Sequence, residues 1–207
     1  MIAILDYGIG NLRSVEKALR HVGADVLVTG DADAVRAARA LVLPGVGAFG
    51  DGMAQLKARG LVPVIEEAAA AGRPILGICL GMQLLFEGSE EMGHHRGLGL
   101  LRGRVRRFPP GLKVPHIGWN QVHIIRPNPL LEGLASGSWV YFAHSYYVEP
   151  REDHTILATT EYGRPFASVV GDGACFGLQF HPEKSQQAGL SILRRFVALA
   201  GEGRSGP

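Results

Sequence analysis

Short apolar runs alternate with stretches of helical periodicity in the first third of the chain, and this alternation constrains the fold most strongly. Four runs have the length and composition of buried strands, at residues 2–5, 25–28, 40–43 and 74–78. Helical spacing of apolar residues is found between and after them, at residues 12–22, 51–58, 64–71 and 80–86. Strands that alternate with helices form parallel sheets covered by helices. The chain is therefore expected to be an α/β protein.

The pattern changes after Gly88, where short β-like segments follow one another without long helices between them. These segments are at residues 99–108, 121–125, 139–148, 155–161, 166–170 and 174–180. They predict an additional antiparallel or mixed β portion. A closing helix is expected after Ser185, which would cap it, and residues 201–207 are expected to be a frayed tail. No linker divides the chain, so residues 1–200 are expected to form a single domain.

Composition and charge exclude several classes of protein. Among 207 residues, 21 Lys and Arg balance 19 Asp and Glu, which leaves a net charge of +2 and no basic surface for nucleic acid or an anionic membrane. We expect no signal peptide and no membrane span. Two cysteines, Cys79 and Cys175, do not make a disulfide framework, so a reducing cytoplasm is the expected location.

Cys79 stands where the expected strand 74–78 passes directly into the expected helix 80–86. Gly77 and Gly81 bracket it and leave room for a sharp turn, which is the pattern of a nucleophile elbow. A thiol at a helix N-terminus is favoured as the reactive thiolate, and the Leu80 N–H points where an oxyanion would form. The alternative is a small buried hydrophobic residue, the reading that we prefer for Cys175.

His181 follows the apolar segment 176–180, so it is expected at the carboxyl end of a strand, as Cys79 is. Ligands of open α/β sheets bind at that edge. Because residues two apart in extended backbone project to the same side, Glu183 can reach the His181 imidazole. A thiol, a base and a carboxylate that orients the base are the three parts of nucleophilic acyl transfer. The alternative for His181 alone is a structural histidine.

Other polar clusters are given structural interpretations. His94 and His95 have no further Cys or His at ligand spacing, so we expect a solvated loop there and no metal site. Four arginines alternate with apolar residues along one expected strand, which indicates its solvent face: Arg102, Arg104, Arg106 and Arg107. No cofactor is expected.

Residues 77–83 and 181–183 resemble the motifs of the class I, or triad, glutamine amidotransferases. Residues 44–50 are similar to the glycine-rich oxyanion loop of that family. The resemblance implies the family's fold and hydrolysis of L-glutamine to glutamate and ammonia. It also implies that Cys79 attacks the carboxamide carbon, while His181, oriented by Glu183, protonates the departing ammonia and then activates water.

The same resemblance implies roles for the residues around the nucleophile. The oxyanion would be held by the N–H of Leu80 and by an N–H from Val46 or Gly47. Gln83, one helical turn after Cys79, would bind the amino-acid part of the substrate. The backbone near Ser145 and Tyr146 would complete the pocket.

Within the family, further segments resemble the glutaminase subunits of imidazole glycerol phosphate synthases. They are residues 6–12 with Ser14, 118–120, 144–147 and Lys184. The resemblance implies a heterodimer with a (β/α)8-barrel cyclase subunit. That partner would use the ammonia to make imidazole glycerol phosphate and the aminoimidazole carboxamide ribonucleotide in histidine biosynthesis. It also implies partner-interface or gating roles for Tyr7, Asn11, Trp119, Asn120 and Lys184.

Ordinary structural roles remain open for these residues: Asn11 as a helix cap, Trp119 as a core side chain and Lys184 as a solvated lysine. Two other functions also remain open. One is a glutaminase that serves anthranilate, guanylate or pyridoxal phosphate formation. The other is a non-hydrolytic redox-sensing or chaperone-like protein of the same fold, against which Gln83 and Glu183 argue.

Overall fold

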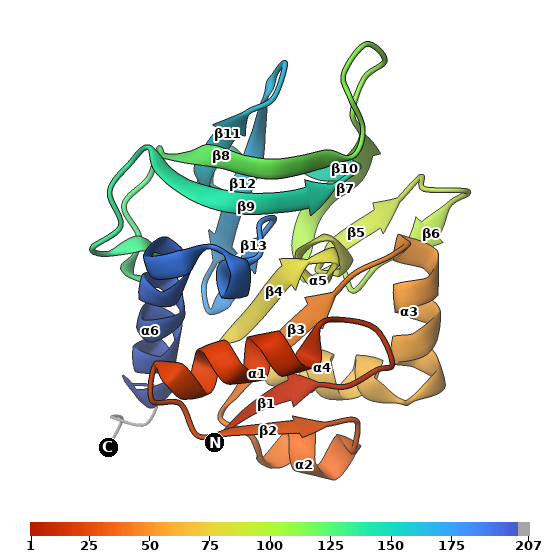
Figure 1. Ribbon diagram of the computed structural model, residues 1–207. Helices are drawn as coiled ribbons and strands as arrows, with labels where there is room; N and C mark the ends of the chain where they lie inside the picture. The colour runs from red at the N-terminus through yellow and green to blue at the C-terminus, as the bar shows by residue number, and fades with distance from the viewer. Residues whose placement is uncertain (203–207) are drawn as a thin grey trace.

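One nine-stranded sheet runs through the computed structural model, which describes residues 1–202 (Figure 1). From edge to edge its strands are β2 (Val26–Thr29), β1 (Ile2–Leu5), β3 (Ala40–Gly45), β4 (Ile75–Cys79), β13 (Cys175–Leu178), β12 (Pro165–Asp172), β11 (Ile156–Glu161), β8 (His116–Ile124) and β9 (Ser138–His144). Pairing is parallel from β2 to β13 and antiparallel from β13 to β9. The predicted α/β class, with a parallel portion and an antiparallel β portion, is confirmed.

Helices cover both faces of the parallel strands. On one face lie α1 (Leu12–His21) and α6 (Gln186–Glu202), and on the other lie α2 (Ala32–Ala37), α3 (Phe49–Ala58) and α4 (Leu61–Ala70) (Figure 1). Side chains of β1 alternate between the two cores, because successive residues of a strand point to opposite faces. Ile2 and Ile4 pack with α1 and α6, whereas Ala3 and Leu5 pack on the opposite side.

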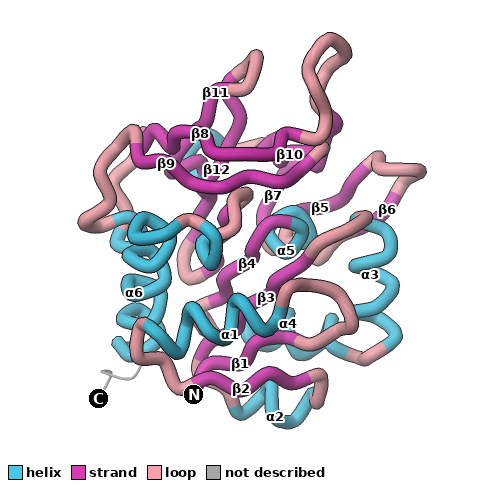
Figure 2. Tube along the Cα trace, viewed as in Figure 1, coloured by secondary structure: helices cyan, strands magenta, loops and turns pink. Residues whose placement is uncertain are grey.

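A second sheet of four strands lies beside α5 (Leu80–Leu84). Its order is β10 (Tyr146–Pro150), β7 (Leu101–Arg107), β5 (Phe86–Ser89) and β6 (His95–Arg96), and Figure 2 shows it on the α3 side of the large sheet. Along β7, Leu101 and Val105 are buried while Arg102 and Arg104 are exposed. Glutamates on neighbouring segments pair with three of the strand's arginines, Arg102, Arg104 and Arg106. The solvent-face prediction for this strand is confirmed.

The structure departs from the sequence prediction at two places that shape the site. The helix expected to reach residue 86 ends at Leu84, and the chain then enters β5. The strand expected over 139–148 is interrupted at Ser145, where the chain leaves β9 of the large sheet and enters β10 of the small one. Both changes occur because a second sheet pairs with these segments, and local periodicity does not report that pairing.

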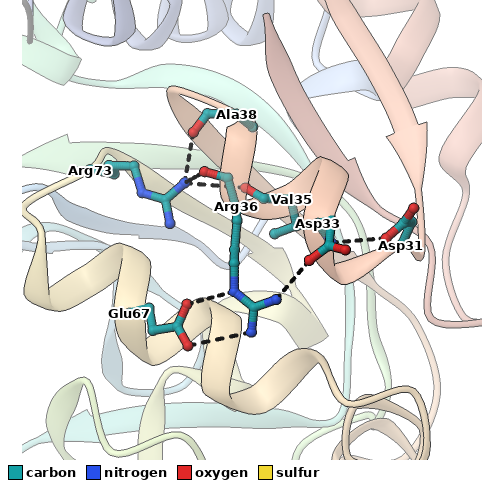
Figure 3. Close-up of polar contacts among 7 residues, drawn as sticks. All are labelled: Asp31, Asp33, Val35, Arg36, Ala38, Glu67 and Arg73. Atoms are coloured by element: carbon teal, nitrogen blue, oxygen red, sulfur yellow. Dashed lines mark hydrogen bonds and ion pairs between the residues drawn. The ribbon is translucent and has the colours of Figure 1, made fainter.

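Helix α2 is short and was not predicted. Figure 3 shows how it is held: Asp31 caps it by accepting from the Asp33 N–H at 2.8 Å, and Arg36 pairs with Glu67 of α4. Arg73 donates to the carbonyl groups of Val35, Arg36 and Ala38 at the end of the helix. Long-range contacts to α4 and Arg73 therefore stabilise a helix that is too short to be stable by itself.

Helix α6 includes Gly201 and Glu202, so the predicted frayed tail is wrong for these two residues. The rest of that predicted tail, residues 203–207, lies outside the described part of the chain. Among the described helices, none is both long and apolar enough to cross a bilayer.

Candidate active site

Strand register brings the predicted site residues to one edge of the sheet. Gly45 at the end of β3 lies beside Cys79 at the end of β4, and Ile78 of β4 pairs with Leu178 of β13. All three strands are parallel, so their carboxyl ends meet. The loop after β3, the thiol after β4 and His181 after β13 consequently lie together, although 181 − 79 = 102 positions separate the two side chains.

The turn at Cys79 has the strained geometry of a nucleophile elbow. Its φ of 55° and ψ of −111° place a non-glycine residue in a sparsely populated region of backbone space. Gly77 and Gly81 are required there. A Cβ on Gly77 would lie 2.7 Å from the Gly81 carbonyl carbon, and a Cβ on Gly81 would overlap the Leu43 carbonyl oxygen. The helix can follow the strand this tightly because both positions lack a side chain.

The thiol, the imidazole and the carboxylate form one hydrogen-bonded set. His181 Nδ1 lies 2.9 Å from Glu183 Oε1, which leaves Nε2 for its hydrogen bond with Cys79. Burial lowers the pKa of His181, but hydrogen bonds with Cys79 and Glu183 and the charges of both groups raise it, to about 10. The arrangement therefore favours the protonated imidazolium of His181 at neutral pH.

Within residues 1–202, the His181 imidazole is the one hydrogen-bond partner of the Glu183 carboxylate. Its side chain is 1% exposed, and Oε2 is buried without a hydrogen-bond partner among residues 1–202. A buried carboxylate oxygen without a partner lowers the stability of the fold.

Ser185 fastens the histidine segment to strand β9. Its hydroxyl donates to the His181 carbonyl at 2.6 Å and accepts from the Tyr141 N–H at 2.9 Å, while the His181 N–H donates to the Tyr141 carbonyl. Ser185 was predicted to cap the closing helix. These bonds show that its fully buried hydroxyl instead ties the segment carrying His181 to the large sheet.

A cavity of about 300 Å³ opens in front of the thiol. It is lined by Cys79 and by all six residues predicted for oxyanion and glutamine binding, namely Val46, Gly47, Leu80, Gln83, Ser145 and Tyr146. The other four lining residues were not predicted from the sequence: Glu91, Pro115, Ala143 and His144. Within the described chain, Glu91 is the one carboxylate in the lining, and its Oε2 accepts from the Phe49 N–H at the start of α3 at 2.7 Å. No local motif distinguishes Glu91 from its neighbour Glu90.

The segment that ends β3 is held at Pro44, whereas Val46 and Gly47 of the following loop have few neighbours. Tyr7 Oη donates to the Pro44 carbonyl at 2.6 Å, and a Cβ on Gly45 would lie 2.5 Å from that hydroxyl oxygen. Val46 is 44% exposed, and Gly47 has a φ of +98°, with no described atom within 4 Å of the point where a Cβ would stand. The Pro44 carbonyl is therefore held by Tyr7, whereas the backbone at Gly47 has open space on the side where a Cβ would stand.

The five residues predicted for an interface or for gating have different surroundings. Tyr7 is fully buried, so its side chain is not available for contact with a partner in this conformation. Asn11 occupies the N-cap position of α1, as the helix-cap alternative expects, but its side chain makes no capping hydrogen bond in the described chain. Trp119 is 44% exposed and is not a core residue. The amide of Asn120 is used internally, and Lys184 lies over the Tyr141 ring at 5.6 Å.

The remaining chemical groups lie outside this set. Within residues 1–202, no three His, Cys, Asp or Glu side chains are grouped to hold a metal ion. Burial and the neighbouring Asp172 raise the pKa of the Cys175 thiol to about 12, so it stays protonated. His95 belongs to β6 and packs its ring against Gly50, where a Cβ would lie 2.6 Å from Cε1.

Comparison with known proteins gives this fold and site a family. A family model described as glutamine amidotransferase class-I matches residues 3–200. The chain belongs to the class-I glutamine amidotransferase family.

Among its relatives, the chain is 55% identical over 198 residues to imidazole glycerol phosphate synthase subunit HisH of Moorella thermoacetica, with 96% of this chain and 94% of the relative covered. It is 57% identical over 192 residues to the protein of the same name from Symbiobacterium thermophilum, covering 93% of this chain and 91% of the relative. A crystal structure of a glutamine amidotransferase matches with a TM-score of 0.77 at 20% identity, over 97% of this chain and 98% of that chain. That last likeness supports the fold alone.

Proposed function

We propose that this chain hydrolyses L-glutamine to L-glutamate and ammonia as the glutaminase subunit of an imidazole glycerol phosphate synthase. One observation carries the proposal: Cys79, hydrogen-bonded to a His181 imidazole that Glu183 orients, lines a cavity together with all six predicted substrate-site residues. The relatives named as subunits of that synthase support the pathway. A redox sensor would need neither the oriented imidazole nor the cavity.

The reaction begins with attack of the Cys79 thiolate on the carboxamide carbon of glutamine. The carbonyl oxygen becomes an oxyanion, which the Leu80 N–H and an N–H of Val46 or Gly47 stabilise. The His181 imidazolium donates its Nε2 proton to the departing nitrogen, so ammonia leaves and a thioester remains. Neutral His181 then takes a proton from water, which attacks the thioester and releases glutamate. Glu183 keeps the imidazole in the required orientation throughout.

The charges that line the cavity indicate how the α-amino and α-carboxylate end of glutamine would be bound. Glutamine carries an α-ammonium group, and Glu91 is the carboxylate that lines the cavity. One Glu91 oxygen accepts from the Phe49 N–H, which leaves Oε1 for the ammonium. The amide nitrogen of Gln83 is used by Tyr146 and Gln179, so its Oε1 is the group that can accept from the substrate. The backbone at Ser145 and Tyr146 would bind the α-carboxylate.

The ammonia is proposed to pass to a (β/α)8-barrel cyclase subunit in a cytoplasmic heterodimer. That partner makes imidazole glycerol phosphate and the aminoimidazole carboxamide ribonucleotide in histidine biosynthesis. Support comes from the "subunit" in the relatives' names and from the exposed Trp119 and Lys184, which are available for contact.

The test separates ammonia production from ammonia use. Cys79→Ser is expected to lower glutamate release by a factor on the order of 10⁶, the loss seen when a triad nucleophile is removed. The synthase assembled from this variant and the cyclase should still turn over with excess ammonium at raised pH. Loss of the ammonium reaction as well would show that Cys79 is needed for something other than ammonia release.

A further inference from the structure

Gln179 is a fully buried polar side chain next to the thiol, and the reaction described above does not use it. It lies just after β13, and its Nε2 is 3.9 Å from Cys79 Sγ. Its Oε1 accepts from Gln83 Nε2 at 3.1 Å. An amide buried beside a nucleophile can orient it through either a donor or an acceptor, so the direction of this contact decides its chemistry.

The Tyr146 carbonyl sets that direction. It can only accept, and it accepts from Gln83 Nε2 at 3.0 Å. The amide nitrogen of Gln83 therefore faces both Tyr146 and Gln179, and the group that Gln179 presents to it is its oxygen. The Gln179 nitrogen is then left to face the sulfur. The orientations of the Gln83 and Gln179 amides are therefore both determined by the Tyr146 carbonyl, which can only accept.

A pair of buried histidines extends the same chain of hydrogen bonds to strand β8. His144 Nδ1 lies 2.7 Å from the Tyr146 carbonyl and must donate to it, so His144 Nε2 accepts from His116 Nδ1 at 3.0 Å. His116 Nε2 accepts in turn from Asn120 Nδ2 at 3.3 Å. Every proton position in the chain of bonds is thereby fixed. Burial lowers the pKa of both rings, to about 3 for His144 and about 4 for His116, which agrees with neutral tautomers.

We propose that Gln179 is a further catalytic residue, whose amide N–H hydrogen-bonds to the Cys79 thiolate, and that Gln83 acts as a positioning residue that holds this amide in place. A hydrogen bond to an ionised acceptor is about twice as strong as one between neutral groups, and a thiolate accepts far better than a thiol. The bond stabilises the reactive form of Cys79 and aims it at the cavity. This inference rests on the proposed role of Cys79 as nucleophile.

Alkylation by iodoacetamide tests the proposal without glutamine turnover. The thiolate displaces iodide from the reagent, so the pH dependence of the rate reports thiolate formation. The experiment uses a Cys175→Ala background, in which Cys79 is the sole cysteine of the chain. Gln179→Met, which keeps the length of the side chain but removes the donor, should raise the pH midpoint of alkylation by about one pH unit. It should also lower kcat for glutamine about tenfold with little change in KM.

The matched control is Gln121→Met, a half-buried glutamine whose amide donates to the Gly137 carbonyl away from the thiol. It should leave the midpoint unchanged. If Gln179→Met does not fold, Gln179→Glu keeps the shape and replaces the donor by a negative charge, so its midpoint should rise further. A wild-type midpoint in a folded Gln179 variant overturns the proposal.

The positioning role of Gln83 has its own readout. Gln83→Met should raise the alkylation midpoint in the same direction by a smaller amount, because Gln179 loses the donor that sets its orientation. If Gln83 only bound glutamine, Gln83→Met would change KM and leave the alkylation midpoint as in the wild type. That result would exclude the positioning role of Gln83. Failure of the proposed function is distinguished by the wild-type assay for glutamate release, which does not depend on these midpoints.

Discussion

At the scale of single residues, the clearest prediction concerns Glu183. Glu183→Gln removes the charge that orients the His181 imidazole but keeps the side-chain shape, so the glutaminase rate should fall by about 10⁴ and less than for Cys79→Ser. Oε2 of Glu183 is buried without a partner in the described chain, so the melting temperature should not fall. Rates of glutamate release and thermal unfolding measured on one preparation check both statements. An unchanged rate would remove Glu183 from the proposed triad.

The buried histidine pair predicts how stability depends on pH. In the folded protein the pKa of His116 is about 4 and that of His144 about 3, both below the ordinary value of 6.5. The unfolded chain therefore binds more protons between pH 6.5 and the folded-state pKa of each ring, about 4 for His116 and about 3 for His144. In that window the free energy of unfolding should fall as the pH falls, by roughly 1.4 kcal/mol per pH unit for each histidine.

His116→Phe checks this pH dependence. Phenylalanine keeps a ring where His116 stacks on Tyr162, with centroids 4.0 Å apart, but removes one titrating group. Urea unfolding between pH 6.5 and pH 4.5 should show a smaller loss of stability with acid than in the wild type. His123→Phe, an exposed histidine on the same strand, is the control and should leave the acid dependence unchanged.

At the scale of elements, the packing of α5 on β3 depends on one missing side chain. A Cβ at Gly81 would overlap the Leu43 carbonyl oxygen, which belongs to a central strand and cannot move away. Gly81→Ala should therefore lower the free energy of unfolding by about 3 kcal/mol or more. Gly201→Ala, in the helix α6 where no described atom lies within 4 Å, should be neutral or slightly stabilising. Equal stabilities of the two variants in urea would contradict this expectation.

Helix α2 gives a second prediction at this scale. Arg73 donates to three carbonyls at the end of α2, at 2.7 to 3.1 Å (Figure 3). Arg73→Met should lower the free energy of unfolding by about 1–3 kcal/mol, since those carbonyls lose a charged donor. Arg36→Met breaks an exposed ion pair and should cost less. Because α2 lies away from the cavity, neither variant should change KM for glutamine.

At the scale of the whole molecule, the isolated chain is expected to be a slow glutaminase that the cyclase and its bound nucleotide activate. Gly47 has open space where a Cβ would stand and the conformational freedom of a glycine, so we expect the second oxyanion donor to point away until a partner sets it. Losing one such donor costs about 10²–10³ in rate. Glutamate formation by the chain alone, by the mixed subunits, and by the mixture with a substrate analogue should rise stepwise.

Lys184 and Asn11 are the residues proposed to sense the barrel. Lys184→Ala and Asn11→Ala should weaken the stepwise rise while leaving complex formation intact, which gel filtration of the mixed subunits would show. Lys184 directly follows the proposed triad carboxylate, and Asn11 stands at the N-cap position of α1 with no capping hydrogen bond from its side chain in the described chain. Equal rates in all three mixtures of the wild type would exclude the switch.

Elements with a local signal could be predicted from the order of amino acids alone. The strand at residues 2–5 and the elbow at Cys79 follow from apolar runs and from glycines where the backbone must turn tightly. The motif around Cys79 and the segment 181–183 also indicated the family, because nucleophile, base and carboxylate stand at strand ends in the sequence.

Contacts between distant groups depend on how the elements pack in three dimensions. Glu91 lines the cavity, the Tyr7 hydroxyl donates to the Pro44 carbonyl, and Gln179 faces the Cys79 sulfur. Each of these contacts joins segments that are far apart in the chain. Sequence periodicity reports which face of an element is buried but not what packs against it. For that reason the end of α5, the break at Ser145 and the histidine pair could not be predicted, since each depends on a neighbour contributed by another part of the fold.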